Sequence, residues 1–294
     1  MTRLPLRIAK HIDQFTGRTW LLPKLLDWFN NRETERLFLL TGGPGSGKSM
    51  VMAWLAGHGP IPVDGTAQQQ LAEIRAEVKA CHFCVADSGN TDPKEVARQI
   101  ADQLTRTVPG FGEALAATLP DQVRINSVLK DVTVQQGGSV TGVYIGYFNL
   151  QGLSEELSFN RVLRDPLQQL YRRDGYDEPM LLLFDALDEA LTYSGKTHIV
   201  HLLQKFSDLP PNVRILATTR DVPQVTNEVK KWRRPYFLMR RSTLLHSLRN
   251  AHSTLRAVIG CSGPSLSGQM TKMVLGCSSS PVVQEQERLR SLPE

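Results

Sequence analysis

A glycine-rich stretch is the strongest sign of chemistry in this sequence. Its glycines let the backbone curl so that successive N–H groups point into one concavity, which suits phosphate oxygens. Lys48 can reach the outer phosphates of a nucleotide, and the Ser49 hydroxyl can ligate Mg²⁺. An apolar run precedes the stretch and a helical pattern follows it, as phosphate binding requires. The stretch fits G-x-x-x-x-G-K-[ST] and consists of Gly42, Gly43, Pro44, Gly45, Ser46, Gly47, Lys48 and Ser49.

A second group of polar residues follows the apolar run 181–184. Asp185 ends this run, which places its carboxylate at the carboxyl edge of the predicted sheet, where it can hold Mg²⁺. Asp188 and Glu189 come three and four residues later, and either can orient or activate an attacking water. The alternative is a strand followed by a helix start, where acidic residues favour the helix dipole.

A third polar group, Thr218, Thr219 and Arg220, follows the apolar residues 215–217 at the end of a predicted strand. There Arg220 can stabilise the negative charge of a terminal phosphate, although an arginine at a strand end is commonly a solvated surface residue. Cys81 and Cys84 have C-x-x-C spacing, but positions i and i+3 of a strand point to opposite faces. We therefore expect these two cysteines to pack in the core rather than to share a metal.

Strand and helix patterns alternate along most of the chain. The helix after Pro93 has Asp92 as its N-cap and Glu95 to complete a capping box. Apolar strands alternating with helices predict an α/β fold, a mostly parallel sheet with helices on both faces. Strands are expected at 36–41, 79–86, 180–184 and 212–218, and helices at 49–57, from 93 onwards, and at 198–206; within 108–173 we expect a strand at 143–150 and a helix at 160–173.

Composition narrows the functional classes. The chain has 294 residues, with 41% hydrophobic and 21% charged side chains and no apolar run long enough to span a membrane. Four cysteines are too few for a disulfide framework, so a cytoplasmic setting is expected. Residues 1–220 hold 23 basic and 24 acidic side chains, against 11 and 5 in residues 221–294. The basic charge therefore belongs to the tail, which argues against nucleic acid as a partner.

The tail differs in kind from the rest. Residues 229–284 contain no Asp or Glu, and nine serines lie between positions 241 and 280. The segment is either basic and partly disordered, or not the natural continuation of the domain. We therefore divide the chain into a lead-in (residues 1–30), a nucleotide-binding domain (residues 31–225) and a basic, Ser-rich tail (residues 226–294).

The order of these motifs resembles that of STAND-class P-loop NTPases, and most closely the NACHT-type ATPase domain. The resemblance covers about residues 12–222 and includes Phe15-Thr16-Gly17-Arg18, the glycine-rich stretch, FDALDE and ATTR. The small Ala186 after Asp185 resembles the NACHT form of the metal-binding motif. The resemblance implies that Gly17 and Arg18 lie near the adenine and ribose, and that Arg220 is the sensor arginine. No winged-helix continuation or repeat array is recognisable after Arg220.

The expected activity is Mg²⁺-dependent binding and slow hydrolysis of ATP in a nucleotide-controlled signalling switch. ATP and ADP are the expected ligands, and self-association or an effector protein the expected partnership. No Asn-Lys-x-Asp segment is present to recognise guanine. Two alternatives remain: a P-loop kinase or other phosphotransferase, and a truncated nucleotide-binding fragment without enzymatic output. The first would transfer the phosphoryl group to a substrate hydroxyl instead of water.

Overall fold

The computed structural model describes residues 4–16, 18–31, 33, 36–88, 90–119, 128–134, 138–145, 150 and 152–230. All of them belong to the first of two compact units, Met1–Arg241; the second is Ser242–Glu294. Gly17 and the tail from residue 231 onwards lie outside the described residues. Within the described part of the chain, no helix has the length and apolar character needed to cross a membrane.

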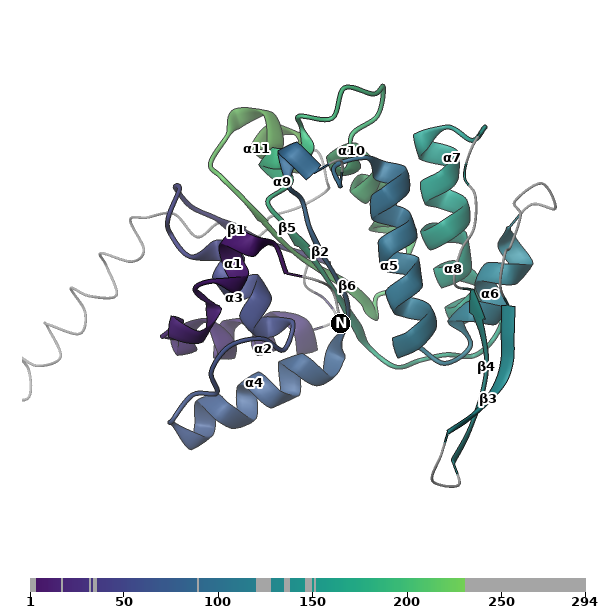
Figure 1. Ribbon diagram of the computed structural model, residues 1–294, viewed down its shortest axis with the longest axis horizontal. Coiled ribbons are helices and arrows are strands. Elements are labelled where there is room, and N and C mark those ends of the chain that lie inside the picture. The colour runs from purple at the N-terminus through teal and green to yellow at the C-terminus, as the bar shows by residue number, and fades with distance from the viewer. Residues whose placement is uncertain are drawn as a thin grey trace, which may run out of the picture. The chain divides into compact units, whose positions relative to one another are not determined.

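A four-stranded, entirely parallel sheet forms the centre of the described chain (Figure 1). Its order is β1-β6-β5-β2, so the first strand in sequence lies beside the last and far from the second. Every residue of β1, β5 and β6 is buried, as expected for strands covered on both faces. The expected α/β fold is thus confirmed, with strands β1 (Leu37–Thr41), β2 (Val78–Phe83), β5 (Met180–Asp185) and β6 (Val213–Thr219).

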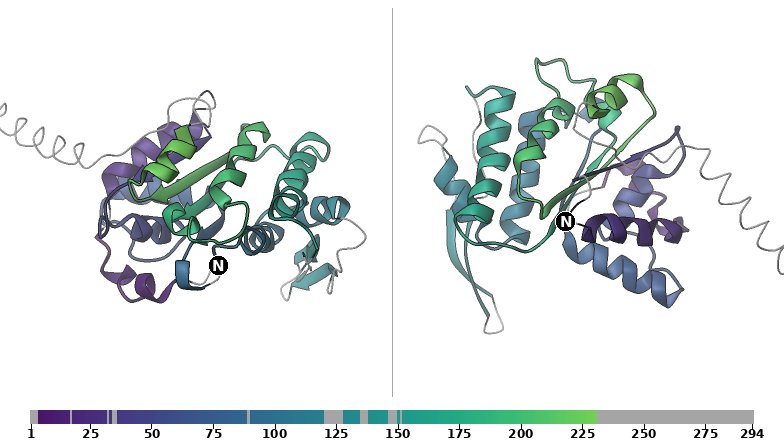
Figure 2. Two further views of the ribbon diagram at one scale, coloured as in Figure 1. Left: turned by 90° about the horizontal axis from the view of Figure 1, so that it is seen from above. Right: turned by 180° about the vertical axis from the view of Figure 1, so that it is seen from behind.

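One face of the sheet packs against the amino-terminal helices (Figure 2). Trp54 is fully buried there and meets the ring of Phe15 edge-on at 5.5 Å. The residues before position 31 therefore pack into the same core as the helix that follows the glycine-rich stretch. The elements of this layer are α1 (Leu6–Ala9), η1 (Ile12–Gln14), η2 (Thr19–Leu21), α2 (Leu22–Asn30), α3 (Lys48–Leu55) and α4 (Gly65–Glu77).

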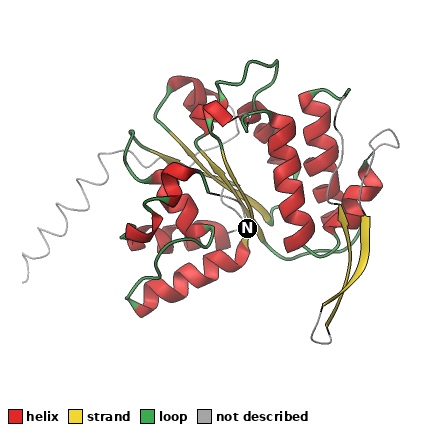
Figure 3. Cartoon of the chain, in the orientation of Figure 1, coloured by secondary structure: helices red, strands yellow, loops and turns green. Residues whose placement is uncertain are grey.

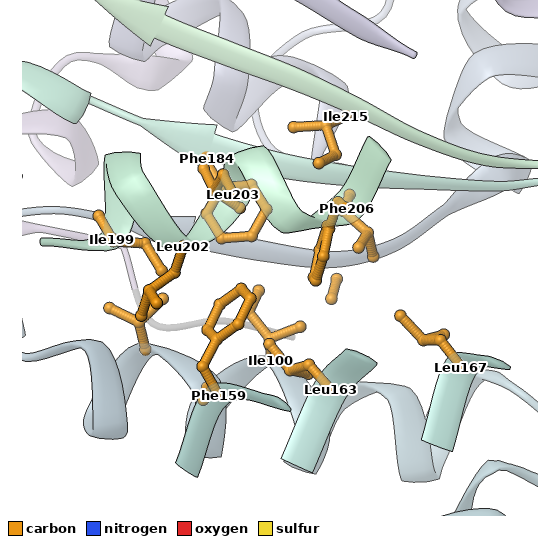
Figure 4. Packing of buried hydrophobic residues seen from close by; sticks show 14 of the residues in the cluster. Ile100, Phe159, Leu163, Leu167, Phe184, Ile199, Leu202, Leu203, Phe206 and Ile215 are labelled. Carbon is orange, nitrogen blue, oxygen red and sulfur yellow. The ribbon is translucent and has the colours of Figure 1, made fainter. Parts of the chain in front are cut away.

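The opposite face carries a larger apolar cluster. Phe159 and Ile100 point from the helices towards Leu203 and Phe206, with strand residues such as Phe184 behind them (Figure 4). Burial of each large side chain contributes roughly 1.5–3 kcal/mol to folding. The layer is built from α5 (Pro93–Thr107), α6 (Phe111–Thr118), α7 (Glu155–Phe159), the π-helical η4 (Asn160–Arg164), α8 (Asp165–Arg172), α10 (Ile199–Leu203) and η5 (Gln204–Asp208).

The segment between β2 and β5 departs most from expectation. The helix expected at 160–173 begins earlier, at Glu155, and changes to a π-helix before Pro166 enters α8 near its start. The strand expected at 143–150 ends at Ile145, and residues 146–149 are outside the described set. This strand is β4 (Gly138–Ile145), and it pairs with β3 (Val128–Val134) in an antiparallel hairpin (Figure 3). The remaining elements are η3 (Ala86–Ser88), α9 (Leu187–Ala190) and α11 (Pro223–Lys230).

Two local predictions can be compared with side-chain contacts. Asp92 caps α5 through the Lys94 N–H at 2.9 Å, as expected. Glu95 instead accepts hydrogen bonds from Arg98 and Gln99 on the same helix, because its side chain points along α5 rather than back to the cap. The two described cysteines, Cys81 and Cys84, are buried free thiols. They belong to apolar clusters on opposite faces of the sheet.

Candidate functional site

The glycine-rich loop connects β1 to α3 at the carboxyl edge of the sheet. Gly45 and Gly47 have φ values of 71° and 83°, a region that glycine reaches without steric cost. The Ser46 N–H donates to the Gly43 carbonyl at 3.3 Å and closes a tight turn that contains Gly45. The chain then enters α3 at Lys48, so the amino end of this helix opens on to the loop.

Lys48 folds back over the loop that precedes it. Its Nζ donates to the carbonyl oxygens of Gly42 at 2.7 Å and Gly43 at 3.1 Å, and to the Ser46 Oγ at 3.2 Å. Burial lowers the pKa of Lys48, an effect that nearby Asp188 and Asp185 oppose. The ammonium group is therefore partly desolvated and held by neutral acceptors, a setting in which an anion would be a better partner.

Arg18 supports the loop from the amino-terminal layer. Its Nη2 donates to the Ser46 carbonyl oxygen at 2.5 Å, and a Cβ on Gly47 would lie 3.2 Å from the same nitrogen. The guanidinium group thus lies against the loop backbone. Phe15, by contrast, is buried against Trp54. Gly17, which the sequence also predicts to contact nucleotide, lies outside the described residues.

Asp185 ends β5 and is fully buried. Its Oδ1 accepts a hydrogen bond from the Thr218 hydroxyl at 2.5 Å, and the Ser49 hydroxyl is close enough to influence the pKa of the carboxylate. Burial raises the pKa of Asp185; the hydroxyls of Thr218 and Ser49 oppose this rise, as does the positive charge of Arg7. Its Oδ2 is buried with no hydrogen-bond partner among the described residues. The carboxylate is therefore one ligand short.

Ala186 redirects the chain immediately after this carboxylate. It has a φ of 57° and a ψ of 53°, and it is the one non-glycine residue with positive φ in the described part of the chain. Its N–H donates to the Thr218 hydroxyl at 2.9 Å, so Thr218 connects Asp185 to the turn. A small side chain tolerates this left-handed conformation better than a branched one. The turn starts α9, which presents Asp188 and Glu189.

Asp188 is bound to the end of β6. Its Oδ1 accepts the Arg220 N–H at 2.9 Å and lies 3.4 Å from the Thr219 hydroxyl, while its Oδ2 lies 3.1 Å from the Arg220 Nε. Arg220 is half exposed, but its carboxylate partner is largely buried. The predicted sensor arginine and one predicted water-activating carboxylate therefore form an ion pair.

Glu189 joins three segments that are distant in sequence. Its Oε1 lies 2.8 Å from the Nη2 of Arg7 in α1 and 3.9 Å from the Nη2 of Arg220. Its Oε2 accepts the N–H of Ala86, in the turn after β2, at 3.1 Å. Asn90 shapes this turn through hydrogen bonds to the Phe83 carbonyl and the Val85 N–H, both at 2.8 Å.

The structure brings together most of the residues that the sequence singles out. Ser49 lies near Asp185, and Lys48 is close enough to Asp185, Asp188 and Arg220 for their charges to shift its pKa. Sequence reasoning missed Arg7 and the bond from Thr218 to Asp185. Arg7 precedes every motif and has no pattern around it, whereas Thr218 carried a weak signal as a polar residue at a strand end.

The donor set fits a hard divalent cation. The Ser49 hydroxyl and the unpartnered Oδ2 of Asp185 are oxygen ligands of the kind that Mg²⁺ prefers alongside phosphate and water. No group of three or more His, Cys, Asp or Glu side chains suited to a metal occurs among the described residues. Such a cluster is not needed here, because Mg²⁺ in phosphate sites is commonly held by one or two protein oxygens.

The fold and the site together indicate a class of protein. The chain is a mixed α/β protein whose parallel sheet, with a glycine-rich loop at its carboxyl edge, is consistent with a P-loop-like nucleotide-binding fold. Residues 17–137 match the family model described as Nephrocystin 3, N-terminal. Comparison with curated proteins gives no match. The matched stretch is less than half of the chain; it includes the Gly42–Ser49 loop and ends before Asp185.

Proposed function

We propose that this chain binds ATP with Mg²⁺ and hydrolyses it slowly, as a nucleotide-controlled switch of the STAND class with NACHT-like motifs. The observation that carries the proposal is the Asp185 carboxylate near Ser49, because its Oδ2 is buried and has no hydrogen-bond partner among the described residues. A buried carboxylate that lacks a ligand destabilises the fold. A divalent cation bound beside the glycine-rich loop accounts for its presence.

Phosphate binding would use groups that the loop already presents. Oxygens of the β- and γ-phosphates would replace the Gly42 and Gly43 carbonyls as partners of the Lys48 ammonium. The exchange is favourable because the ammonium group is attracted more strongly to an anionic phosphate oxygen than to a neutral carbonyl oxygen. The amino end of α3 would add its partial positive charge. Arg18 would keep the loop backbone in place through the Ser46 carbonyl.

The metal would be held by the Ser49 hydroxyl and the Asp185 carboxylate. When bound, Mg²⁺ supplies positive charge that stabilises the phosphate oxygens during transfer. Thr218 fixes the carboxylate by donating to its Oδ1 and leaves Oδ2 for the metal side. The Ala186 turn keeps the backbone after Asp185 bound to the same threonine hydroxyl.

Hydrolysis would depend on Asp188 or Glu189 as the group that orients or activates water. Both carboxylates are engaged: Asp188 by Arg220, and Glu189 by Arg7 and the Ala86 N–H. A carboxylate whose oxygens already accept strong hydrogen bonds is a poor general base. Turnover would therefore require a rearrangement at this edge, which agrees with a slow, switch-like ATPase.

The remaining features of the proposal follow from the sequence. Adenine is favoured because no guanine-recognition segment is present. A cytoplasmic setting suits the buried free thiols of Cys81 and Cys84. Self-association or an effector protein would transmit the nucleotide state. The domain that does this would span residues 31–225 together with the lead-in, because residues before position 31 pack into the same core as α3.

The test is equilibrium titration of the full chain with a fluorescent ATP analogue, with and without Mg²⁺, followed by competition with unlabelled ATP, ADP and GTP. Saturable binding that needs Mg²⁺ and yields to adenine nucleotides is expected. Phosphate release to water should then be slow, and adding hydroxyl acceptors should not speed ADP formation. Absence of saturable binding would overturn the proposal, and acceptor-dependent ADP formation would favour a phosphotransferase.

A further inference from the structure

Among the residues that the structure describes, Arg7 is the one cation at the site that comes from outside every recognised motif. It lies in α1, ahead of the stretch that matches the family model. Its Nη2 contacts the Glu189 Oε1 at 2.8 Å, and its charge acts on the buried Asp185 as well. Its side chain is 50% exposed, whereas that of Glu189 is 13% exposed. The contact therefore joins a solvent-facing arginine to a largely buried carboxylate.

The segment that carries Arg7 is fixed to the nucleotide-facing helix. α1 packs against α3, the helix that begins at Lys48, and Ile8 next to Arg7 is buried in their shared core. Further along, the Ile12 carbonyl oxygen would be 2.9 Å from a Cβ placed on Gly59, just after α3. Because the backbone that follows Arg7 is held against α3, its guanidinium can move by side-chain rotation alone.

The charges at this edge are close to balance without any nucleotide. Four cations (Lys48, Arg18, Arg7 and Arg220) stand beside three carboxylates (Asp185, Asp188 and Glu189). Arg7 and Arg220 lie against carboxylates, and Arg18 lies against the loop backbone. A triphosphate adds about four negative charges and Mg²⁺ adds two positive ones, so occupancy leaves an excess of negative charge. Arg220 is close enough to Lys48 for its charge to lower the pKa of that lysine, and Arg7 lies against Glu189 and acts on Asp185. A guanidinium group is well suited to phosphate oxygens.

We propose that Arg7 is a specificity-determining residue. When a nucleoside triphosphate binds, the Arg7 guanidinium breaks its contact with Glu189 and binds the terminal phosphate. This inference rests on the proposed ATP-binding function and deepens it. Glu189 keeps the Ala86 N–H and lies within 3.9 Å of Arg220, so its carboxylate stays supported when Arg7 departs. A diphosphate offers no terminal phosphate, and with it Arg7 remains on Glu189. The exchange frees Glu189 only in the triphosphate state.

The experiment is isothermal titration of the full chain with ADP and with a non-hydrolysable ATP analogue, both in Mg²⁺. Arg7→Ala should weaken binding of the ATP analogue by about tenfold or more, since a hydrogen bond to a charged group contributes about 1.5–3 kcal/mol. ADP affinity should stay within about twofold. Arg7→Lys should lie between, because it keeps the charge and loses the forked geometry. The matched control is Lys10→Ala, an exposed cation beyond the end of the same helix.

A second variant keeps the inference testable if Arg7→Ala unfolds. Glu189→Gln releases Arg7 from its partner, so it should tighten binding of the ATP analogue and leave ADP unchanged. Where Arg7→Ala does fold, this gain should disappear in the double variant, because the two side chains act as one unit. Equal effects of either variant on both nucleotides, or a gain that persists in the double variant, would overturn the assignment. No nucleotide binding by the unaltered chain would overturn the ATP proposal itself.

Discussion

The glycine-rich loop meets the acidic edge, which consists of Asp185, Asp188 and Glu189, at Ser49 and Asp185. These two halves of the site are nevertheless assembled in different ways. Lys48 makes its hydrogen bonds within the loop, to groups no more than six residues away. The acidic edge is held by long-range contacts: Glu189 is 182 residues from Arg7 and 103 from Ala86. One half of the site is thus a local structure, and the other exists only once the chain has folded.

The comparison predicts that single changes in the loop act on ligand binding more than on folding. Lys48→Ala should weaken ATP affinity roughly 100-fold, because the charged donor to two phosphates is lost. The nucleotide-free chain should keep its thermal midpoint, since burial lowers the pKa of Lys48 and the fold gains little from its charged form. Titration with a fluorescent ATP analogue and thermal unfolding measure the two effects. Lys196→Ala, at an exposed loop position, is the control and should change neither.

The same contrast explains what the sequence could predict. The loop, the end of β5 at Asp185 and the parallel sheet depend on local patterns, such as a glycine spacing or a run of apolar residues. The Arg7–Glu189 contact and the hydrogen bond from Thr218 to Asp185 depend on strand order, since β6 lies between β1 and β5. Nothing near Arg7 in the sequence marks its partner, so only the folded chain identifies it.

Within the acidic edge, substitutions of the two α9 carboxylates should slow hydrolysis to different extents. If Glu189 is the group that activates water, Glu189→Gln should slow hydrolysis about 10- to 100-fold while nucleotide binding persists. Asp188→Asn should slow it less, because Asp188 mainly holds Arg220 through its backbone N–H and its Nε. Single-turnover phosphate release at saturating ATP measures both. The reverse order would assign water activation to Asp188, and unchanged turnover in both variants would place it elsewhere.

Substitution of Asp185 should differ from substitution of Lys48 in its effect on folding. Lys48→Ala should leave the thermal midpoint of the nucleotide-free chain unchanged, whereas a change at Asp185 should raise it. Burial raises the pKa of Asp185, so the folded chain binds this proton more tightly than the unfolded chain does. Its favourable contribution is complete at low pH, below the unfolded pKa, and is lost as the pH rises through the raised folded pKa. Asp185→Asn should therefore raise the thermal midpoint at neutral pH by a few degrees, about 1–2 kcal/mol.

Two further observations would sharpen this prediction. The gain from Asp185→Asn should shrink as the pH is lowered, because the natural carboxyl then takes up its proton. The variant should also lose the extra stabilisation that Mg²⁺ adds to nucleotide binding. Asp27→Asn, at an exposed position, provides the baseline. A lower midpoint for Asp185→Asn at neutral pH would mean that the ionised carboxylate stabilises the nucleotide-free fold.

The smallest expected effect comes from Arg18, the residue that links the loop to the amino-terminal layer. Arg18→Ala removes the charged donor to the Ser46 carbonyl and leaves Lys48 and the backbone of the loop in place. ATP affinity should fall about three- to tenfold, since a single hydrogen bond contributes about 0.5–1.5 kcal/mol net. ADP should be affected equally, because the Ser46 carbonyl belongs to the loop itself and not to the terminal phosphate. Arg18→Lys keeps one donor and should recover part of the loss. An effect confined to ATP would place Arg18 at the terminal phosphate beside Arg7, and the loop would then depend on long-range contacts as much as the acidic edge does.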